Sequence, residues 1–259
     1  MNNVVVASSE QDAAAMEAVK QHHAEMGGAL AALVEGLVVA AEKGAAEPAR
    51  ERLLQWARTE LVPHALAEEQ VMYPLAHQDD RARLLVEAML GEHRLIVALV
   101  DDLAATGSPV RAAAQAMALQ VLFESHLAKE NEQVLPLLAA EPGASLAQAL
   151  EGMHELLGGH QDGHSHGAVG GCGGGCACGE TDPVGVAPEL DARAVPHAIR
   201  HATIFGALDS VQSGQGLVLL APHDPLPLLR QLEARAPGAF TVDYLERGPD
   251  TWRLLFVRS

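Results

Sequence analysis

The sequence predicts an all-α up-down four-helix bundle, followed through a linker by a small α/β two-layer sandwich of β-α-β-α-β-β order. Hydrophobic residues make up 49% of the 259-residue chain and aromatic residues only 3%. A core of Ala, Leu and Val suits closely packed helices. A repeat also indicates the bundle: His64-Ala-Leu-Ala-Glu68 and His126-Leu-Ala-Lys-Glu130 are each followed by Pro-Leu, ten residues after the histidine. We therefore interpret residues 1–157 as one helical hairpin written twice.

The helices of the bundle are expected where apolar residues recur at steps of three and four. They cover about residues 10–42, 48–74, 79–105, 109–136 and 144–157. Pro48 and Pro109 stand in the first turns of their helices, where proline is tolerated, and Pro63 is expected to bend the second helix. Short connections between long helices favour antiparallel neighbours, which gives the up-down order.

Residues 158–188 differ in composition, being rich in Gly, His and Cys, and we interpret them as a flexible linker. From residue 189 onward, short apolar runs alternate with helical patterns. The expected strands cover residues 189–193, 217–221, 240–245 and 252–257, and the expected helices cover residues 198–211 and 225–236. The chain is thus divided into a bundle (1–157), a linker (158–188) and a sandwich (189–259).

Charge and cysteine content exclude several classes of partner. The net charge is −17, so we expect no nucleic-acid partner and no binding to an anionic membrane. Residues 1–10 contain no basic segment followed by a long apolar one, and no apolar run approaches the ~20 residues of a membrane span. The three cysteines are too few for a disulfide scaffold. We therefore expect a cytoplasmic protein.

Six ionisable side chains of the bundle are expected to face its axis. The spacing His-x-x-x-Glu places both side chains on one helix face, about 5–6 Å apart, and one further histidine lies in the helix before each pair. Burying these groups unpaired would be costly, whereas two metal ions bridged by the carboxylates would compensate them. Mixed His and carboxylate ligands in such bundles suit iron or manganese. The expected ligands are His23, His64, Glu68, His93, His126 and Glu130.

Neighbouring residues leave alternatives. His22 adjoins His23, but His23 continues the apolar steps of its helix, whereas His22 lies about 100° away around the helix axis. We therefore assign His23 and keep His22 as the alternative. Glu69 and Glu132 are interpreted as solvated, or as outer groups that support the ligands.

On these six residues, residues 12–157 resemble the hemerythrin-like (HHE cation-binding) domain family, whose ligand order they match. The resemblance implies two iron ions in a non-haem di-iron centre bridged by Glu68 and Glu130. It implies a protein that binds, senses or detoxifies O2, nitric oxide or peroxide, with a redox or metal-accepting protein as partner. The family's oxygen carriers have a fifth histidine where this sequence has Val97, which disfavours reversible O2 carriage. The alternative function is an iron store or donor, as in iron–sulfur repair.

The linker and the C-terminal domain each contain a candidate for a second metal site, and the alternative for the linker is a flexible segment that binds metals only opportunistically. The linker's thiols and imidazoles suit zinc, copper or iron, although the cysteine spacing is not that of a zinc ribbon. These residues are Cys172, Cys176, Cys178, His160, His164 and His166. The C-terminal candidates are His197, His201, His223 and Asp224. They gather at one edge of the sheet if its first two strands are parallel neighbours; the alternative is that they are helix-capping and surface residues.

Residues 189–259 resemble a small uncharacterised domain family related to the TusA/SirA-type sulfur carriers. The resemblance rests on the order of elements and on Leu190-Asp-Ala-Arg193, Ala221-Pro-His-Asp-Pro225 and Gly248-Pro-Asp-Thr-Trp252. Sulfur carriers have a cysteine seven residues after the opening leucine. His197 stands at that position here, so sulfur transfer is not expected.

Overall fold

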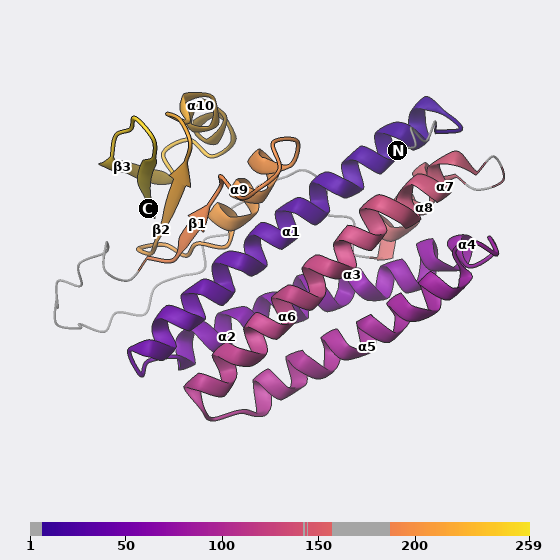
Figure 1. Ribbon diagram of the computed structural model, residues 1–259, viewed down its shortest axis with the longest axis horizontal. Helices are drawn as coiled ribbons and strands as arrows, with labels where there is room; N and C mark the ends of the chain where they lie inside the picture. The colour runs from indigo at the N-terminus through magenta and orange to yellow at the C-terminus, as the bar shows by residue number, and fades with distance from the viewer. Residues whose placement is uncertain (1–6, 142, 144, 157–186) are drawn as a thin grey trace.

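The computed structural model describes residues 7–141, 143, 145–156 and 187–259, and its N-terminal part consists of long helical segments that lie side by side (Figure 1). The α-helices are α1 (Glu10–Glu42), α2 (Glu47–Trp56), α3 (Val62–Ala67), α4 (Tyr73–Ala76), α5 (Arg83–Ala105), α6 (Pro109–Lys129), α7 (Leu135–Ala140) and α8 (Leu146–Leu156). Three π-helical segments lie between some of them: η1 (Ala57–Leu61) joins α2 to α3, η2 (Glu68–Met72) joins α3 to α4, and η3 (Glu130–Val134) joins α6 to α7. The helical N-terminal region agrees with the predicted bundle.

Prolines determine where the long helices widen into π turns. Pro63, Pro74 and Pro136 each stand two residues after the end of a π segment. A proline inside a helix has no N–H to donate, and its ring collides with the carbonyl group four residues earlier. A wider turn relieves that collision. Because η2 and η3 begin at Glu68 and Glu130, the repeated prolines also shape the backbone that presents the two predicted bridging carboxylates.

Two apolar clusters fill the interior of the bundle. One contains Leu30, Leu37, Leu53, Leu103 and Phe123. The other contains Val19, Met72, Met89, Val134 and Leu138. Helix α1 contributes to both, and its buried His23 lies between Val19 of one cluster and Met26 of the other. The predicted ligands therefore occupy a polar layer that is closed off by apolar side chains on two sides.

Helix α1 also bears on the expectation that no segment spans a membrane. It is the one helix, among the described residues, whose length and composition would allow it to cross one. In this fold, 44% of its most apolar 18-residue window is buried inside the protein. The same apolar residues thus supply the core of the bundle.

The C-terminal domain is a four-stranded sheet with two helices. Its elements are β1 (Glu189–Asp191), α9 (Arg200–Asp209), β2 (Gly216–Ala221), α10 (Leu226–Arg235), β3 (Phe240–Glu246) and β4 (Trp252–Arg258). The strand order is β1-β2-β4-β3, with β1 parallel to β2 and the other pairs antiparallel. The element order agrees with the prediction, although β1 ends two residues earlier than expected because the chain turns at Ala192.

The two domains meet where α9 lies along α1 (Figure 1). A Cβ atom added to Gly28 of α1 would lie 1.9 Å from the carbonyl oxygen of Thr203, and one added to Gly206 of α9 would lie 1.9 Å from that of Glu25. Ala32 of α1 belongs to the apolar cluster under the sheet. The helices therefore approach each other through glycine backbone, and the C-terminal domain covers α1 around Glu25, Gly28 and Ala32.

Candidate metal centre

The structure brings all six predicted ligands together in the polar layer of the bundle. Their side chains come from four helical segments, α1, α3–η2, α5 and α6–η3, and each residue is only 0–4% exposed. His22, the alternative to His23, is exposed, and its ring centroid lies 5.1 Å from that of His64. The burial of His23 thus favours the assignment made from the apolar steps.

The carboxylate of Glu68 contacts histidines on both sides. Its Oε1 lies 2.9 Å from Nε2 of His64 and 3.4 Å from Nε2 of His23. Its Oε2 lies 3.6 Å from Nε2 of His93. One oxygen therefore faces His23 and His64, which we call the first histidine pair, and the other oxygen faces the opposite side.

The carboxylate of Glu130 has the matching arrangement. Its Oε2 lies 3.7 Å from Nε2 of His23, and its Oε1 lies 3.6 Å from Nε2 of His126. His93 and His126, the second histidine pair, have their Nε2 atoms 3.0 Å apart. Each carboxylate thus directs one oxygen to each pair, which is the disposition of ligands that bridge two cations.

The four donor atoms around the first pair provide a test of whether a cation fits. His23 Nε2, His64 Nε2, Glu68 Oε1 and Glu130 Oε2 are buried and make no hydrogen bond within the protein. Burying such atoms without partners is costly. A metal ion accepts lone pairs from all four at once, so the residues present fit a cation. Two overlapping groups have ligand atoms close enough to hold one: His23, His64 and Glu68, and Glu68, His93 and His126.

Electrostatics couples these groups even without a metal. Burial opposes the charging of His23, but Glu68 and Glu130 outweigh it and raise the pKa of His23. Burial likewise opposes ionisation of Glu68, yet the surrounding His64, His23 and His93 hold the pKa of Glu68 well below its usual range. The pKa values of His93 and His126 are raised in the same way, because contact with Glu68 and Glu130 respectively outweighs burial. Protons and metal ions therefore compete for the same nitrogen atoms.

Three outer groups orient the imidazoles. The Nδ1 of His93 lies 2.8 Å from Oε1 of Glu69, and the Nδ1 of His126 lies 3.0 Å from Oε2 of Glu92. The Nδ1 of His23 lies 2.8 Å from Oδ1 of Asn131. Donation from Nδ1–H leaves the Nε2 lone pair for a metal, and such partners strengthen metal ligands.

Glu92 and Asn131 were not anticipated as outer groups. The repeat carries a signal for Asn131, which follows Glu130 as Glu69 follows Glu68, but none for Glu92, whose counterpart before His23 is the exposed His22. The repeat thus extends one residue beyond the ligands. Glu69 is one of the outer groups, whereas Glu132 is exposed.

Tyr73 is a buried member of the site that was also not anticipated. Its hydroxyl donates a hydrogen bond to Oε1 of Glu130 at 2.7 Å, and lies 3.1 Å from Nε2 of His126 and 3.3 Å from Nε2 of His93. Burial and the charges of Glu130 and Glu68 raise the pKa of Tyr73, so the phenol keeps its proton. The equivalent residue in the second repeat is Leu135, so Tyr73 distinguishes the second histidine pair from the first.

The C-terminal candidates do not converge in the same manner. Strands β1 and β2 are parallel neighbours, as the hypothesis required. His197 and His223 are exposed, His201 Nδ1 lies 3.0 Å from Oε1 of Gln231, and Asp224 accepts a hydrogen bond from Tyr244. In the described part of the chain, no group with metal-ligand spacing includes these residues. The linker candidates, Cys172, Cys176, Cys178, His160, His164 and His166, lie outside the described residues.

Comparison with protein families gave two matches. Residues 14–138 match the hemerythrin HHE cation binding domain. Residues 189–258 match an uncharacterized conserved protein family, DUF2249. Searches of curated proteins and of solved structures gave no significant match.

Proposed function

Since the chain contains a hemerythrin HHE cation-binding domain followed by a DUF2249 domain, we propose that its bundle holds two iron ions and binds, senses or detoxifies O2, nitric oxide or peroxide. The observation that carries the proposal is the placement of the two carboxylates. Glu68 and Glu130 each direct one oxygen toward each histidine pair. This placement supports a dinuclear centre over a single ion.

In the proposed centre, His23 and His64 would hold one ion, His93 and His126 would hold the other, and Glu68 and Glu130 would bridge them. Iron bound there would supply redox chemistry toward a small oxidant or diatomic molecule. The chain's own residues do the positioning: the outer groups fix the imidazole rings, and the apolar clusters keep bulk water from the layer. Tyr73 holds a proton on its oxygen beside Glu130.

Iron storage or donation to a client protein is the second candidate function. A donor must let its metal leave through an open path or a mobile segment. The six proposed ligands are buried, and three of their imidazoles are held by a second layer of hydrogen bonds. This enclosure favours retention of the metal, so we favour a reactive di-iron centre over iron storage or donation.

Metal content and spectroscopy of the full chain test the proposal. The protein would be reconstituted with ferrous iron without oxygen, then analysed for bound metals and by Mössbauer spectroscopy before and after addition of O2 or nitric oxide. We expect about two irons per chain and a change in the iron signals with at least one of these molecules. One metal per chain, or zinc alone with no response to either, would overturn it. Transfer of the iron to an external chelator within seconds would instead support the storage function.

A further inference from the structure

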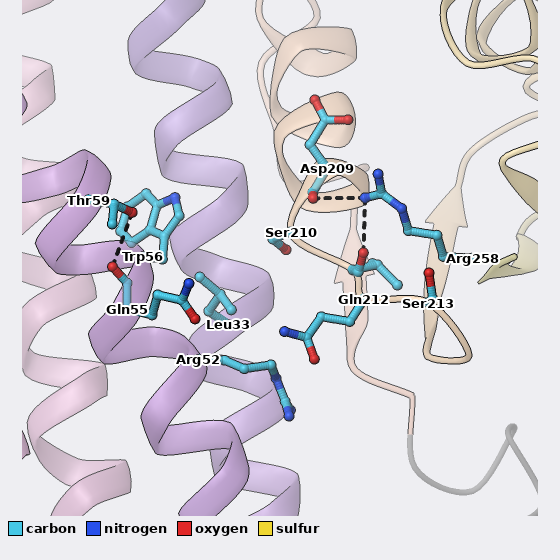
Figure 2. Close-up of a pocket in the computed structure, with 11 residues that line it drawn as sticks. Leu33, Arg52, Gln55, Trp56, Thr59, Asp209, Ser210, Gln212, Ser213 and Arg258 are labelled. Carbon is cyan, nitrogen blue, oxygen red and sulfur yellow. Dashed lines mark hydrogen bonds between the residues drawn. The ribbon is translucent and has the colours of Figure 1, made fainter. Parts of the chain in front are cut away.

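A pocket of about 440 Å³ lies outside the metal centre, at the seam between the two domains (Figure 2). One wall comes from α1, α2 and η1 of the bundle, and the other from the end of α9, the turn that follows it and Arg258, the last residue of β4. Its volume is within the range of small-molecule sites, which are common between domains.

The pocket is locally basic in a chain that is strongly acidic. Arg52 and Arg258 line it, although the chain has 34 Asp and Glu residues against 17 Lys and Arg residues. Partial burial lowers the pKa of Arg52, and no carboxylate offsets that effect. Within the described part of the chain, the Arg52 guanidinium has neither an ion pair nor a hydrogen bond. With twice as many acids as bases available, a half-buried arginine that lacks a carboxylate is an unusual arrangement.

The carboxylate in the pocket lining does not neutralise this charge. Asp209 directs its side chain to Arg235, whose Nη2 lies 2.9 Å from Oδ2 of Asp209. The backbone carbonyl groups of Asp209 and Val211 accept hydrogen bonds from Nη1 of Arg258, each at 3.0 Å. Arg258 is therefore held in place by neutral carbonyl groups, as Figure 2 shows, and not by a carboxylate of the pocket lining.

The rest of the lining supplies neutral donors and an aromatic ring. The amide of Gln212 extends toward the bundle wall, where Arg52 and Leu33 lie (Figure 2). Gln55 adds a second amide on that wall, and Trp56 adds an indole ring. A guanidinium with amide donors suits a carboxylate or phosphate group, and an indole offers a flat surface to a planar ring.

We propose that this pocket binds a small organic anion in which a phosphate or carboxylate group is attached to a planar ring. Arg52 pairs with the anionic group, Gln55 and Gln212 donate hydrogen bonds to it, and Trp56 packs against the ring. The site is separate from the metal centre. Arg52 and His64 nevertheless belong to one continuous helical run, α2–η1–α3, in which Arg52 lies roughly 18 Å before His64 at 1.5 Å per residue.

Tryptophan fluorescence tests the proposal directly, because the chain has only two tryptophans. In the full chain with Trp252→Phe, Trp56 is the sole indole and reports on the pocket. We would titrate three probes: adenosine monophosphate, benzoate and uncharged adenosine. We expect a saturable change in Trp56 emission with adenosine monophosphate, with benzoate or with both, and none with adenosine; the anion that responds distinguishes phosphate from carboxylate recognition.

Two arginine variants complete the test. Arg52→Gln should weaken binding of the responding anion at least tenfold, as expected for loss of a charge-assisted pair. Arg58→Gln is the matched control, since Arg58 is an exposed arginine of the adjoining segment η1 that does not line the pocket, and it should bind as the parent does. Absence of a saturable change with both anions, equal responses to adenosine, or unchanged affinity in Arg52→Gln would overturn the proposal. None of these outcomes depends on iron, so the experiment tests the anion site separately from the proposed function of the metal centre.

Discussion

The carboxylate of Glu69 lies 2.8 Å from the Nδ1 of His93 and joins the two hairpins of the repeat. Glu69 follows the bridging candidate of the first hairpin, whereas His93 belongs to the second. The reverse connection runs from Asn131 of the second hairpin to His23 of the first, also at 2.8 Å. Two of the three outer hydrogen bonds therefore cross between the halves, so each hairpin positions a proposed ligand of the other, whereas the contact of Glu92 with His126 stays within the second hairpin.

Substitution of Glu69 therefore tests whether the outer groups support metal binding. Replacing it with Ala leaves the Nδ1 of His93 without its acceptor, and we expect metal affinity to fall about 10- to 100-fold, as for other supporting residues. Glu132→Ala, which changes an exposed carboxylate nearby, is the control. Competition with a metal-binding dye would measure both. Equal affinities in the two variants would show that the Glu69 contact does not support the site.

Substitution of the bridging candidates tests the number of metals. Glu68→Gln and Glu130→Gln keep the side-chain volume but remove the charge that would hold two dications close together. We expect either change to lower the metal content from about two irons toward one, while circular dichroism shows unchanged helix content. Glu132→Gln should leave two irons bound. If both bridging variants keep two irons, the bridged centre must be abandoned.

The ligand layer was predictable because its chemistry is local in sequence. A histidine and a glutamate four residues apart share a helix face wherever that helix lies, and the apolar steps place His23 and His93 inward. The outer partners depend instead on how helices cross. The repeat marks Asn131 as the counterpart of Glu69, but nothing local indicates that Asn131 contacts His23, 108 positions away along the chain. Glu69 could accordingly be interpreted only as solvated or supporting.

Two further features escaped prediction for the same reason. Tyr73 stands where the second repeat has Leu135, so the repeat does not indicate a role for it in the site. Gly28 lies in an apolar helix, and its role depends on the approach of Thr203, whose position only the fold defines. The repeat predicts the features that both hairpins share, whereas Tyr73 is a residue at which the hairpins differ.

Tyr73→Phe tests the hydrogen bond that this difference creates. In the metal-free protein, the variant leaves Oε1 of buried Glu130 without its donor, and we expect the free energy of unfolding to fall by about 1–3 kcal/mol. Tyr244→Phe is the control, because it removes a part-buried hydroxyl that donates to Asp224, and its effect should be smaller. Urea unfolding of both variants measures the difference. Equal losses of unfolding free energy in the two variants would mean that water takes over the hydrogen bond of the Tyr73 hydroxyl to Glu130.

The pH dependence of stability should differ in sign between metal-free and metal-loaded protein. Glu68 and Glu130 raise the pKa values of His23, His93 and His126. In the metal-free state this contribution is fully present below the unfolded histidine pKa of about 6.5 and is lost as pH rises through the raised folded values. Metal binding needs neutral imidazoles, so its contribution grows over the same range.

Melting temperatures of both forms, measured between pH 5.5 and pH 8, check this expectation. The gap between loaded and metal-free protein should widen as pH rises. A constant gap would mean that the histidines do not lose protons when the metal binds, and would exclude them as its main ligands. Tris and phosphate should be avoided, since both bind metal ions.

The contact between α1 and α9 gives the last prediction, which concerns how firmly the domains are joined. A Cβ at position 28 would lie 1.9 Å from the carbonyl oxygen of Thr203. Because the obstacle is backbone, Gly28→Ala must push α9 away from α1. We expect a lower melting temperature and faster proteolysis between the domains.

Gly36→Ala supplies a matched control on the same helix, because a Cβ there would meet nothing within 4 Å. It should stabilise α1 by roughly 1 kcal/mol through helix propensity alone. The two substitutions are chemically identical, so opposite shifts in melting temperature isolate the close approach of the helices. Gly206→Ala should reproduce the loss from the other side, where a Cβ would lie 1.9 Å from the carbonyl oxygen of Glu25. If Gly28→Ala and Gly206→Ala both behave like Gly36→Ala, α9 does not pack on α1 in solution, and the pocket at the same seam loses its second wall.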